Sequence, residues 1–176
     1  MSIHYNQNLH AIAAVLPNRG IGHRNRLIVH DSLDTFMFFN VTIGHTVVMG
    51  RKTFESMQCR PLSYRKNIVL SETLPEDTPG VQVARSVMNL MHMIDQSDTY
   101  VIGGGQIYAL LLPYCRYVHL TKFDSNNATQ LILPADTYFP ELSDKEWKAV
   151  NGLTIERKLG YDVTNKVRFE TYVRIQ

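Results

Sequence analysis

The sequence predicts an α/β fold in one domain, and three observations support this class. Short apolar runs alternate with amphipathic stretches along the 176 residues, a pattern typical of strands that alternate with helices. This length accommodates one domain with a sizeable core and is short for two. The composition, 44% hydrophobic and 19% charged, is that of an ordinary globular protein. We therefore expect a single domain over residues 1–176, with residues 1–8 as a short N-terminal extension.

Eight segments have the composition of strands. The first, residues 9–16, is almost wholly apolar and stops at a Pro-Asn-Arg-Gly turn. The others are residues 46–49, 66–71, 81–84, 99–103, 117–124, 153–158 and 167–175. Because helical segments separate the earlier strands, we expect one central mixed sheet that is mostly parallel, with an antiparallel C-terminal strand.

Four segments favour helices that flank this sheet. Residues 31–42 place apolar side chains near helical spacing behind a possible Asp or Ser cap. The apolar face of this helix, with Leu33, Phe38 and Phe39, should meet the sheet. The other segments are residues 51–57, 86–95 with Ser86 as the cap, and 106–112.

The charge balance argues against a nucleic-acid-binding or membrane-binding protein. Eighteen basic and sixteen acidic residues leave a formal charge of +2, and there is no run of Lys or Arg. No apolar run approaches the roughly 20 residues that cross a bilayer. We therefore expect neither nucleic acid nor membrane as a partner.

The cysteines and histidines indicate neither a metal site nor a disulfide. Cys59 and Cys115 lack metal or redox spacing, and the seven histidines show no H-x-x-x-H pair. The N-terminus has no basic segment ahead of its apolar run, as a signal peptide would. Free thiols in a reducing compartment fit these features, so we expect a cytoplasmic protein that binds no metal.

Two junctions between a strand and a helix indicate a phosphate-bearing ligand. Residues 46–49 lead into Gly50-Arg51-Lys52-Thr53, and residues 99–102 lead into Gly103-Gly104-Gly105-Gln106. Such junctions point free backbone N–H groups outward, and glycines let the backbone approach a pyrophosphate. The glycine triplet alone is a weak signal, because a tight turn without a ligand also needs glycine. Two junctions in one small sheet favour a dinucleotide at the carboxyl ends of the strands.

Asp34 is the carboxylate of interest, since it lies in the predicted helix 31–42 beside apolar residues. Its ordinary interpretation is a surface side chain. The alternative is a carboxylate at the apolar edge of a pocket, which would pair with N–H groups of a ligand.

Eight motifs resemble those of dihydrofolate reductases, in that family's order and spacing. They are IAA at 12–14, GIG at 20–22, VMGRKTFES at 48–56, RPL at 60–62, RKNI at 65–68, VIGGGQIY at 101–108, LT at 120–121 and DTYFP at 136–140. The resemblance covers roughly residues 9–175. It implies an eight-stranded mixed sheet with four flanking helices, NADPH as hydride donor, 7,8-dihydrofolate as acceptor, and antifolate inhibitors as further ligands. The family is commonly monomeric.

The resemblance also implies roles for residues that bind the substrate. Asp34 matches the family's pocket carboxylate, which holds the amino group and a ring N–H of the pterin, and Thr121 matches the threonine that supports it. Arg65 matches the arginine that binds the glutamate carboxylate of the substrate, although a solvated cation at a strand edge is its alternative. The remaining positions around the substrate are Ile12, Leu27, Val29, Phe38, Met57, Leu62, Ile102 and Tyr108.

For the cofactor, the resemblance implies contacts at both junctions. Gly50, Arg51, Lys52 and Thr53 would face the phosphates, and Gly103, Gly104, Gly105, Gln106 and Ile107 would cover the pyrophosphate. Arg51, Ser71 and Arg85 would meet the ribose 2′-phosphate, and Ala14 and Ile21 the nicotinamide.

The chain departs from the family in the loop after Gly22. The usual Leu-Pro-Trp is Leu27-Ile28-Val29 here, which removes an indole N–H that anchors a water near the pterin and a proline that constrains the loop. We therefore expect altered turnover, loop closure and diaminopyrimidine affinity. Two alternatives stay open: a reductase of the same fold that acts on a pyrimidine of riboflavin synthesis, and a protein that keeps NADPH without catalysis.

Overall fold

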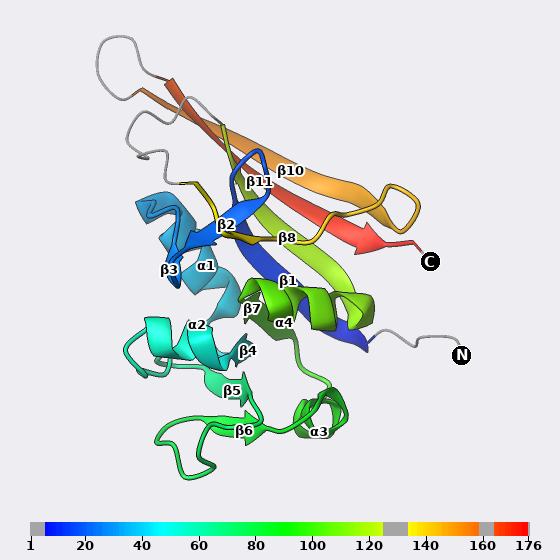
Figure 1. Ribbon diagram of the computed structural model, residues 1–176. Helices are drawn as coiled ribbons and strands as arrows, with labels where there is room; N and C mark the ends of the chain where they lie inside the picture. Colours follow the sequence, from blue (N-terminus) through cyan, green and yellow to red (C-terminus); the bar gives the residue numbers. More distant parts are fainter. Residues whose placement is uncertain (1–5, 125–133, 159–163, 176) are drawn as a thin grey trace.

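The computed structural model describes residues 6–124, 134–158 and 164–175. An eight-stranded sheet in the order β10-β11-β8-β1-β7-β4-β5-β6 forms its centre (Figure 1). The strands are β1 (Asn6–Val15), β4 (Thr46–Gly50), β5 (Lys66–Leu70), β6 (Gln82–Ala84), β7 (Thr99–Gly103), β8 (Cys115–Phe123), β10 (Trp147–Lys158) and β11 (Thr164–Arg174).

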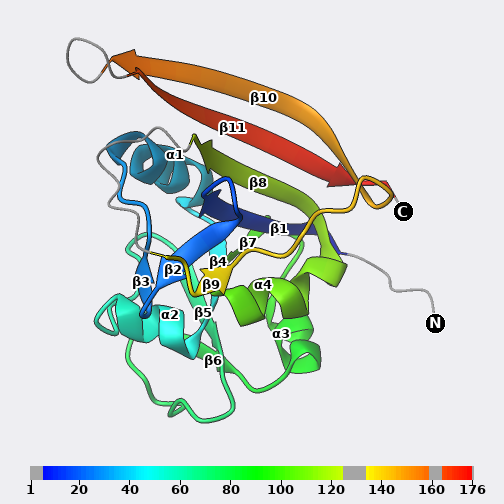
Figure 2. The same ribbon diagram turned by 45° about the horizontal axis from the view of Figure 1, so that its top comes forward.

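Of these strands, only β11 runs against the others. Each neighbouring pair from β8 to β6 is parallel, whereas β11 pairs antiparallel with both β8 and β10. The mostly parallel sheet with an antiparallel C-terminal strand is therefore confirmed. Figure 2 shows β10 and β11 as a long twisted ribbon along one edge of the molecule.

In the part of the chain that the structure describes, four α-helices flank the sheet, as predicted. They are α1 (Ser32–Thr42), α2 (Arg51–Ser56), α3 (Val87–Met93) and α4 (Gly105–Leu111), and a 3₁₀ turn, η1 (Leu112–Tyr114), follows α4. The Asp31 carboxylate caps α1 by accepting from the N–H groups of Leu33 and Asp34. Ser86 caps α3 by accepting from the N–H of Asn89, as its position in the sequence predicts. Among the described residues, no helix is both long and apolar enough to cross a membrane.

Side chains alternate between the two faces of the sheet and build the two larger of three clusters of buried side chains. On one face, Leu9, Val48 and Val101 pack with Leu90 of α3 and Leu111 of α4. On the other face, the buried side chains of Val47, Met49, Val69 and Tyr100 pack with Phe54 of α2, and Ile12 and Val41 pack against them. The parallel strands are therefore buried on both sides, which is why they read as continuous apolar runs.

Helix α1 departs from the prediction, because its apolar residues do not form one face against the sheet. Phe36 is 62% exposed and Phe39 is 41% exposed, and the only buried side chain of the helix is Thr42. Apolar side chains occur all round this short helix, so no orientation can bury them all.

A second sheet was not predicted. It has the order β3-β2-β9 and joins β2 (Gly20–His23), β3 (Arg26–Leu27) and β9 (Thr137–Tyr138). Strands of two to four residues with glycine and charged side chains carry no apolar run. Strand β10 also starts at Trp147, six residues before the expected start.

Candidate functional site

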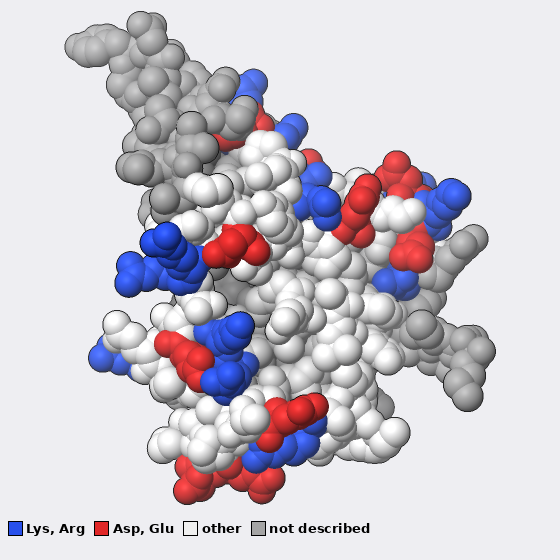
Figure 3. Space-filling view, in the orientation of Figure 1, with Lys and Arg blue, Asp and Glu red and all other residues white. Residues whose placement is uncertain are grey.

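A cleft of about 1190 Å³ opens across the carboxyl ends of the parallel strands. Strand β1, helix α1, the turn between β2 and β3, and the starts of α2 and α4 supply most of its walls. In Figure 3 the surface is hollowed between the β2–β3 turn and α2, with Lys and Arg side chains on both sides. Among the described residues, Arg26, Arg51 and Lys52 are the Lys and Arg residues that line the cleft.

Asp34 lies in the first turn of α1 and lines this cleft, which favours the pocket carboxylate over a surface side chain. Its backbone N–H donates to the Asp31 side chain at 3.0 Å, so the cap of the helix also positions Asp34. Burial raises the pKa of the Asp34 carboxyl above its ordinary value, and the charge of Asp31 raises it further. A hydrogen bond from the Thr121 hydroxyl acts in the opposite direction, because it stabilises the ionised form.

Tyr108 lies close to this carboxylate at the back of the cleft. Its hydroxyl donates to the carbonyl oxygen of Ile12 at 2.7 Å. Burial raises the pKa of the Tyr108 phenol far above its ordinary value, and the charge of Asp34 adds to the effect. The phenol is therefore a fixed neutral donor that ties α4 to β1.

The apolar walls of the cleft come from residues predicted to surround the substrate or the nicotinamide. Ile12 and Ala14 lie on β1, Ile21 on β2, and Ile102 on β7. Leu27, Phe38, Met57, Leu62 and Tyr108 complete the set. An apolar cleft with one desolvated carboxylate matches a flat heterocycle that carries a few N–H groups.

Arg65 lies beside the end of α1 and is not among the residues that line the cleft. Its Nε donates to the Thr42 hydroxyl at 2.8 Å and one terminal nitrogen donates to the Ser63 carbonyl at 2.9 Å. The guanidinium carbon lies 4.9 Å from the centre of the Phe39 ring. These contacts hold the guanidinium at the rim while its terminal nitrogens keep N–H groups for an anion.

Both predicted phosphate junctions open into the cleft. Gly50 and Gly104 are the N-cap residues of α2 and α4, and neither helix has a side-chain cap, so the first N–H groups of both helices are available to a ligand. Arg51, Lys52 and Thr53 line the first junction; Gly104, Gly105, Gln106 and Ile107 line the second. Uncapped donors beside two cations fit the phosphates of a dinucleotide.

The glycines at these junctions have a packing role of their own. A Cβ on Gly50 would lie 2.7 Å from Cγ1 of Ile107, and a Cβ on Gly105 would lie 2.9 Å from Cγ2 of Thr137. Gly103 has a φ of +113°, and its Cβ would lie 3.0 Å from the Tyr108 ring. The glycines therefore let the two junctions and β9 approach closely, which places both helix starts in one cleft.

Ser71 and Arg85 lie at the ends of β5 and β6, outside the residues that line the cleft. Arg85 donates to the Ser71 carbonyl at 2.9 Å and contacts Glu76 at 3.3 Å. The two predicted residues are thus brought together, beyond the junction at Gly50. Arg51, the third member, contacts Glu55 at 2.7 Å.

Val29, which replaces the usual tryptophan, does not line the cleft. It is 4% exposed and packs with Phe123 and Val167. The loop that precedes it is anchored by Asp136, whose carboxylate accepts from the N–H of Arg24 at 2.7 Å and whose own N–H donates to the Gly22 carbonyl at 3.1 Å.

Several residues in the walls of the cleft were not predicted. They are His119, Thr171, Met37, Val41, Ser56, Asp136, Thr137 and Tyr138, whereas Thr35 lines the cleft as a pocket position, as expected. Helical spacing from Asp34 could have indicated Met37 and Val41, since residues three and seven positions along share a face. Nothing in the local sequence indicated His119 or Thr171, whose strands come together only in the sheet.

Comparison with known proteins agrees with this geometry. The family described as Dihydrofolate reductase matches residues 8–174. The chain belongs to the dihydrofolate reductase family. It is 36% identical to a dihydrofolate reductase of Bacillus subtilis over 154 residues, which are 86% of this chain and 88% of the relative. It is 38% identical to the type 3 enzyme of Salmonella typhimurium over 144 residues, which are 81% of this chain and 85% of the relative.

A solved structure supports the same assignment. The dihydrofolate reductase of Enterococcus faecalis, complexed with NADP(H) and RAB-propyl, superposes with a TM-score of 0.81 at 30% identity, covering 98% of this chain and 99% of the other. The protein is therefore an oxidoreductase that reduces dihydrofolate with NADPH. This finding favours the folate enzyme over both the pyrimidine reductase and the protein without catalysis.

Proposed function

We propose that Asp34 and Thr121 form the catalytic polar pair of this reductase. In the ionised form, Asp34 accepts charge-assisted hydrogen bonds from the amino group and a ring N–H of the pterin. This interaction favours protonation of the ring nitrogen next to the carbon that takes hydride. The desolvated carboxylate in the cleft, hydrogen-bonded by Thr121, is the observation that carries the proposal.

Reduction of dihydrofolate to tetrahydrofolate requires one hydride and one proton. NADPH, when bound, supplies the hydride, and the ring nitrogen takes one proton from solvent, which gives tetrahydrofolate. Asp34 orients the ring and a water carries the proton, so the carboxylate acts as an orienting group rather than as the final donor.

The apolar residues of the cleft hold the rest of the substrate and the nicotinamide. Ile12, Leu27, Phe38, Met57, Leu62 and Ile102 surround the pterin and aminobenzoyl groups, with Val29 supporting the loop nearby. Ala14 and Ile21 border the nicotinamide, and Tyr108 separates the two ligands. Arg65 binds the glutamate carboxylate through its two terminal nitrogens, a geometry that suits the planar guanidinium.

The two helix starts hold the cofactor's phosphates. The N–H groups after Gly50 and Gly104 donate to the pyrophosphate, and Arg51 and Lys52 add positive charge. Ser71 and Arg85, with Arg51, bind the ribose 2′-phosphate and select NADPH. The protein acts in the cytoplasm as a monomer and binds antifolate inhibitors in the same cleft as the substrate.

The test is oxidation of NADPH with dihydrofolate by the purified full chain. Asp34→Asn is compared with the parent, and Asp77→Asn, at an exposed aspartate, is the matched control. We expect the parent and the control to oxidise NADPH and Asp34→Asn to be strongly impaired. Full kcat/KM in Asp34→Asn would remove the role assigned to this carboxylate.

A further inference from the structure

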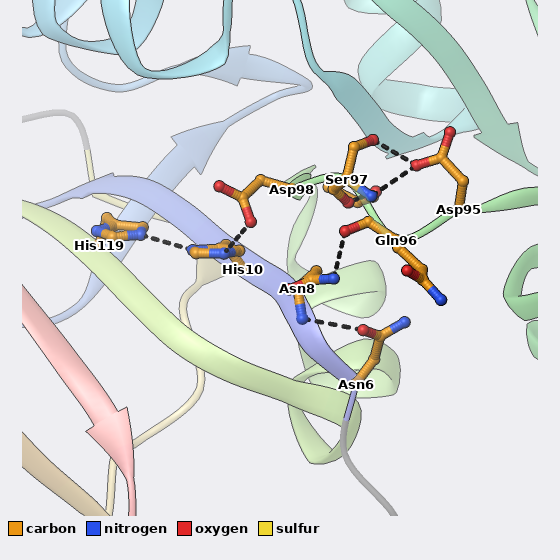
Figure 4. A network of polar contacts seen from close by, with 9 residues as sticks. Asn6, Asn8, His10, Asp95, Gln96, Ser97, Asp98 and His119 are labelled. Atoms are coloured by element: carbon orange, nitrogen blue, oxygen red, sulfur yellow. Dashed lines mark hydrogen bonds and ion pairs between the residues drawn. The ribbon is translucent and has the colours of Figure 1, made fainter.

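A row of polar side chains crosses the sheet from the inner wall of the cleft to the surface. It runs from Thr171 on β11 through His119 on β8 and His10 on β1 to Asp98, just before β7. Figure 4 shows the contacts of His10 with His119 and with Asp98. Thr171 and His119 line the cleft, whereas the Asp98 side chain is 44% exposed.

Two contacts in this row, between the histidines and between His119 and Thr171, have hydrogen-bond distances. His119 Nδ1 lies 3.1 Å from the Thr171 hydroxyl oxygen, and His119 Nε2 lies 3.0 Å from His10 Nδ1. His10 Nε2 lies 3.3 Å from the Asp98 carboxylate. That nitrogen is buried and has no aligned hydrogen-bond partner among the described residues, and the Asp98 carboxylate beside it favours the form of His10 that carries a hydrogen there.

The segment that carries Asp98 is held against β1 by its own contacts. The side chain of Asn8 donates to the carbonyl oxygen of Gln96. The N–H of Ser97 donates to Asp95 at 2.8 Å. Asp98 therefore reaches His10 from a fixed turn, although its carboxylate is partly exposed.

The row lies next to the polar pair that includes Asp34. His119 and Thr121 are two positions apart on β8, so their side chains share a face, and neighbouring positions on one face are about 7 Å apart. Thr171 pairs with His119 in the sheet, just as Phe169 pairs with Thr121. A ligand held by Asp34 and Thr121 therefore lies about one pair of same-face strand positions away from Thr171.

With both histidines neutral, Asp98 permits one arrangement of hydrogens. His10 Nε2 must carry its hydrogen toward the carboxylate, so His10 Nδ1 accepts from His119 Nε2. His119 Nδ1 is then an acceptor, and the Thr171 hydroxyl must donate to it. The Thr171 oxygen consequently offers only lone pairs to the cleft.

One added proton reverses this order. His10 then carries hydrogens on both nitrogens: its charged ring faces the Asp98 carboxylate through Nε2, and its Nδ1 donates to His119 Nε2. The hydrogen of His119 moves to Nδ1, which donates to the Thr171 oxygen, and the hydroxyl hydrogen of Thr171 becomes free to donate. A second proton is excluded, because two N–H groups would then face each other across 3.0 Å.

We propose that Thr171 is a specificity-determining residue of the cleft, and that His119, His10 and Asp98 set whether its hydroxyl offers a hydrogen or a lone pair. The lone-pair form favours a ligand N–H, and the donor form favours a ring nitrogen or carbonyl. Uptake of one proton by His10 thereby changes the Thr171 hydroxyl from an acceptor to a donor toward the cleft, and the backbone does not move.

The surroundings place the uptake of this proton on the acid side of neutral. Burial lowers the pKa of His119 to about 4, and the neighbouring His10 contributes. Burial also lowers the pKa of His10, with Asp98 acting against it and His45 adding to it. The other groups facing the pair are the Tyr100 and Tyr117 rings, each 4.9 Å from the His10 ring. The Lys122–Glu170 ion pair belongs to the opposite face.

Nitrogen NMR of the imidazole rings in the isotope-labelled full chain tests the switch directly. As the pH is lowered from neutral, we expect the pair to take up one proton, and His119 to change from Nε2–H to Nδ1–H in the same step. Asp98→Asn should move that step to lower pH. Asp95→Asn, a control in the same turn whose carboxylate contacts Ser97, should leave it in place. Independent protonation of both rings, or a His119 that keeps its Nε2–H form, would overturn the switch.

The effect on the cleft is measured with Thr171→Val, and this part rests on the proposed function. One neutral hydrogen bond contributes about 0.5–1.5 kcal/mol. The ratio of kcat/KM for dihydrofolate, parent over variant, should therefore change about twofold to tenfold across the NMR step. A ratio independent of pH would overturn the role of Thr171. Absence of dihydrofolate reduction at every pH would contradict the proposed function instead, and the NMR result would then decide the switch alone.

Discussion

Replacing Asp34 by Asn should strengthen the fold while it weakens catalysis. Burial raises the pKa of the Asp34 carboxyl, with the charge of Asp31 adding to it, so folding favours the neutral acid over the ion. Each pKa unit corresponds to about 1.4 kcal/mol of free energy. The ionised carboxylate therefore destabilises the folded chain at neutral pH, and a neutral amide of the same shape does not.

The sign of the pH dependence follows from the raised pKa. Below the ordinary value of 3.8, Asp34 is protonated in both the folded and the unfolded chain and its charge has no effect on stability. Between 3.8 and the higher folded pKa, the folded chain binds more protons, so stability falls as pH rises. Above the pKa of Asp34 in the folded chain, the ionised carboxylate destabilises the fold by its full amount. The gain in Asp34→Asn should grow through this interval and then level off.

The expected magnitudes are large enough to measure. A domain of this size changes its melting temperature by about 2–4 °C per kcal/mol, so the gain is about 3–6 °C for each unit by which the pKa is raised. Catalysis should fall much further. Two charge-assisted hydrogen bonds of about 1.5–3 kcal/mol each correspond to a loss of about a hundredfold to ten-thousandfold in kcat/KM.

Thermal unfolding followed by circular dichroism, at a series of pH values, gives the stability difference, and NADPH oxidation gives the rate. Asp77→Asn serves as the control in both measurements. A melting temperature that falls in Asp34→Asn, or a gain that does not depend on pH, would refute the argument from a buried charge.

Three further predictions follow from contacts in and beside the cleft. Gly50→Ala should lower the free energy of unfolding by about 1–3 kcal/mol in denaturant unfolding, because its Cβ would lie 2.7 Å from Ile107. Ile107→Ala in the same chain should remove most of that loss. Additive effects of the two changes would contradict this prediction. Arg65→Lys should raise the KM for dihydrofolate about tenfold or more with a smaller change in kcat, since it loses the planar fork; an unchanged KM in steady-state kinetics would exclude the role. Asp31→Ala should lower stability by about 1 kcal/mol and also reduce kcat/KM, because Asp31 caps α1 and holds the N–H of Asp34; loss of stability with unchanged kcat/KM would show that the cap does not position Asp34.

The sequence predicted those parts of the fold that depend on local patterns. The strands β4, β5 and β7 are buried on both faces, so each appears as a continuous apolar run with clear ends. Ser86 and Asp31 lie where capping residues are expected, and each caps its helix. Local patterns therefore sufficed to locate the strands and helices of the main sheet along the chain and to predict that the sheet is mostly parallel with an antiparallel C-terminal strand.

The sequence did not predict features that depend on distant partners. Strands β2 and β9 pair across more than a hundred residues, Gly20 with Tyr138, and neither has an apolar run of its own. The exposed Phe39 contradicts the face predicted for α1, whereas Leu33 and Phe38 are half-buried, because apolar side chains occur all round that helix. Asp34 could be assigned to a pocket only through the family motifs, because its neighbours in the sequence do not distinguish a cleft from the surface.

The place of β1 in the sheet has a consequence for synthesis of the chain. The first strand lies at the centre, between β7 and β8, and its Leu9 pairs with Thr99, about 90 residues later. At about 5–20 residues per second, a ribosome needs about 5–20 s to make that distance. Throughout this interval β1 is exposed, because its neighbours β7 and β8 have not yet been synthesised. Strand β1 is thus exposed to aggregation during this interval, and a chaperone that shields residues 9–16 would act before the cleft exists.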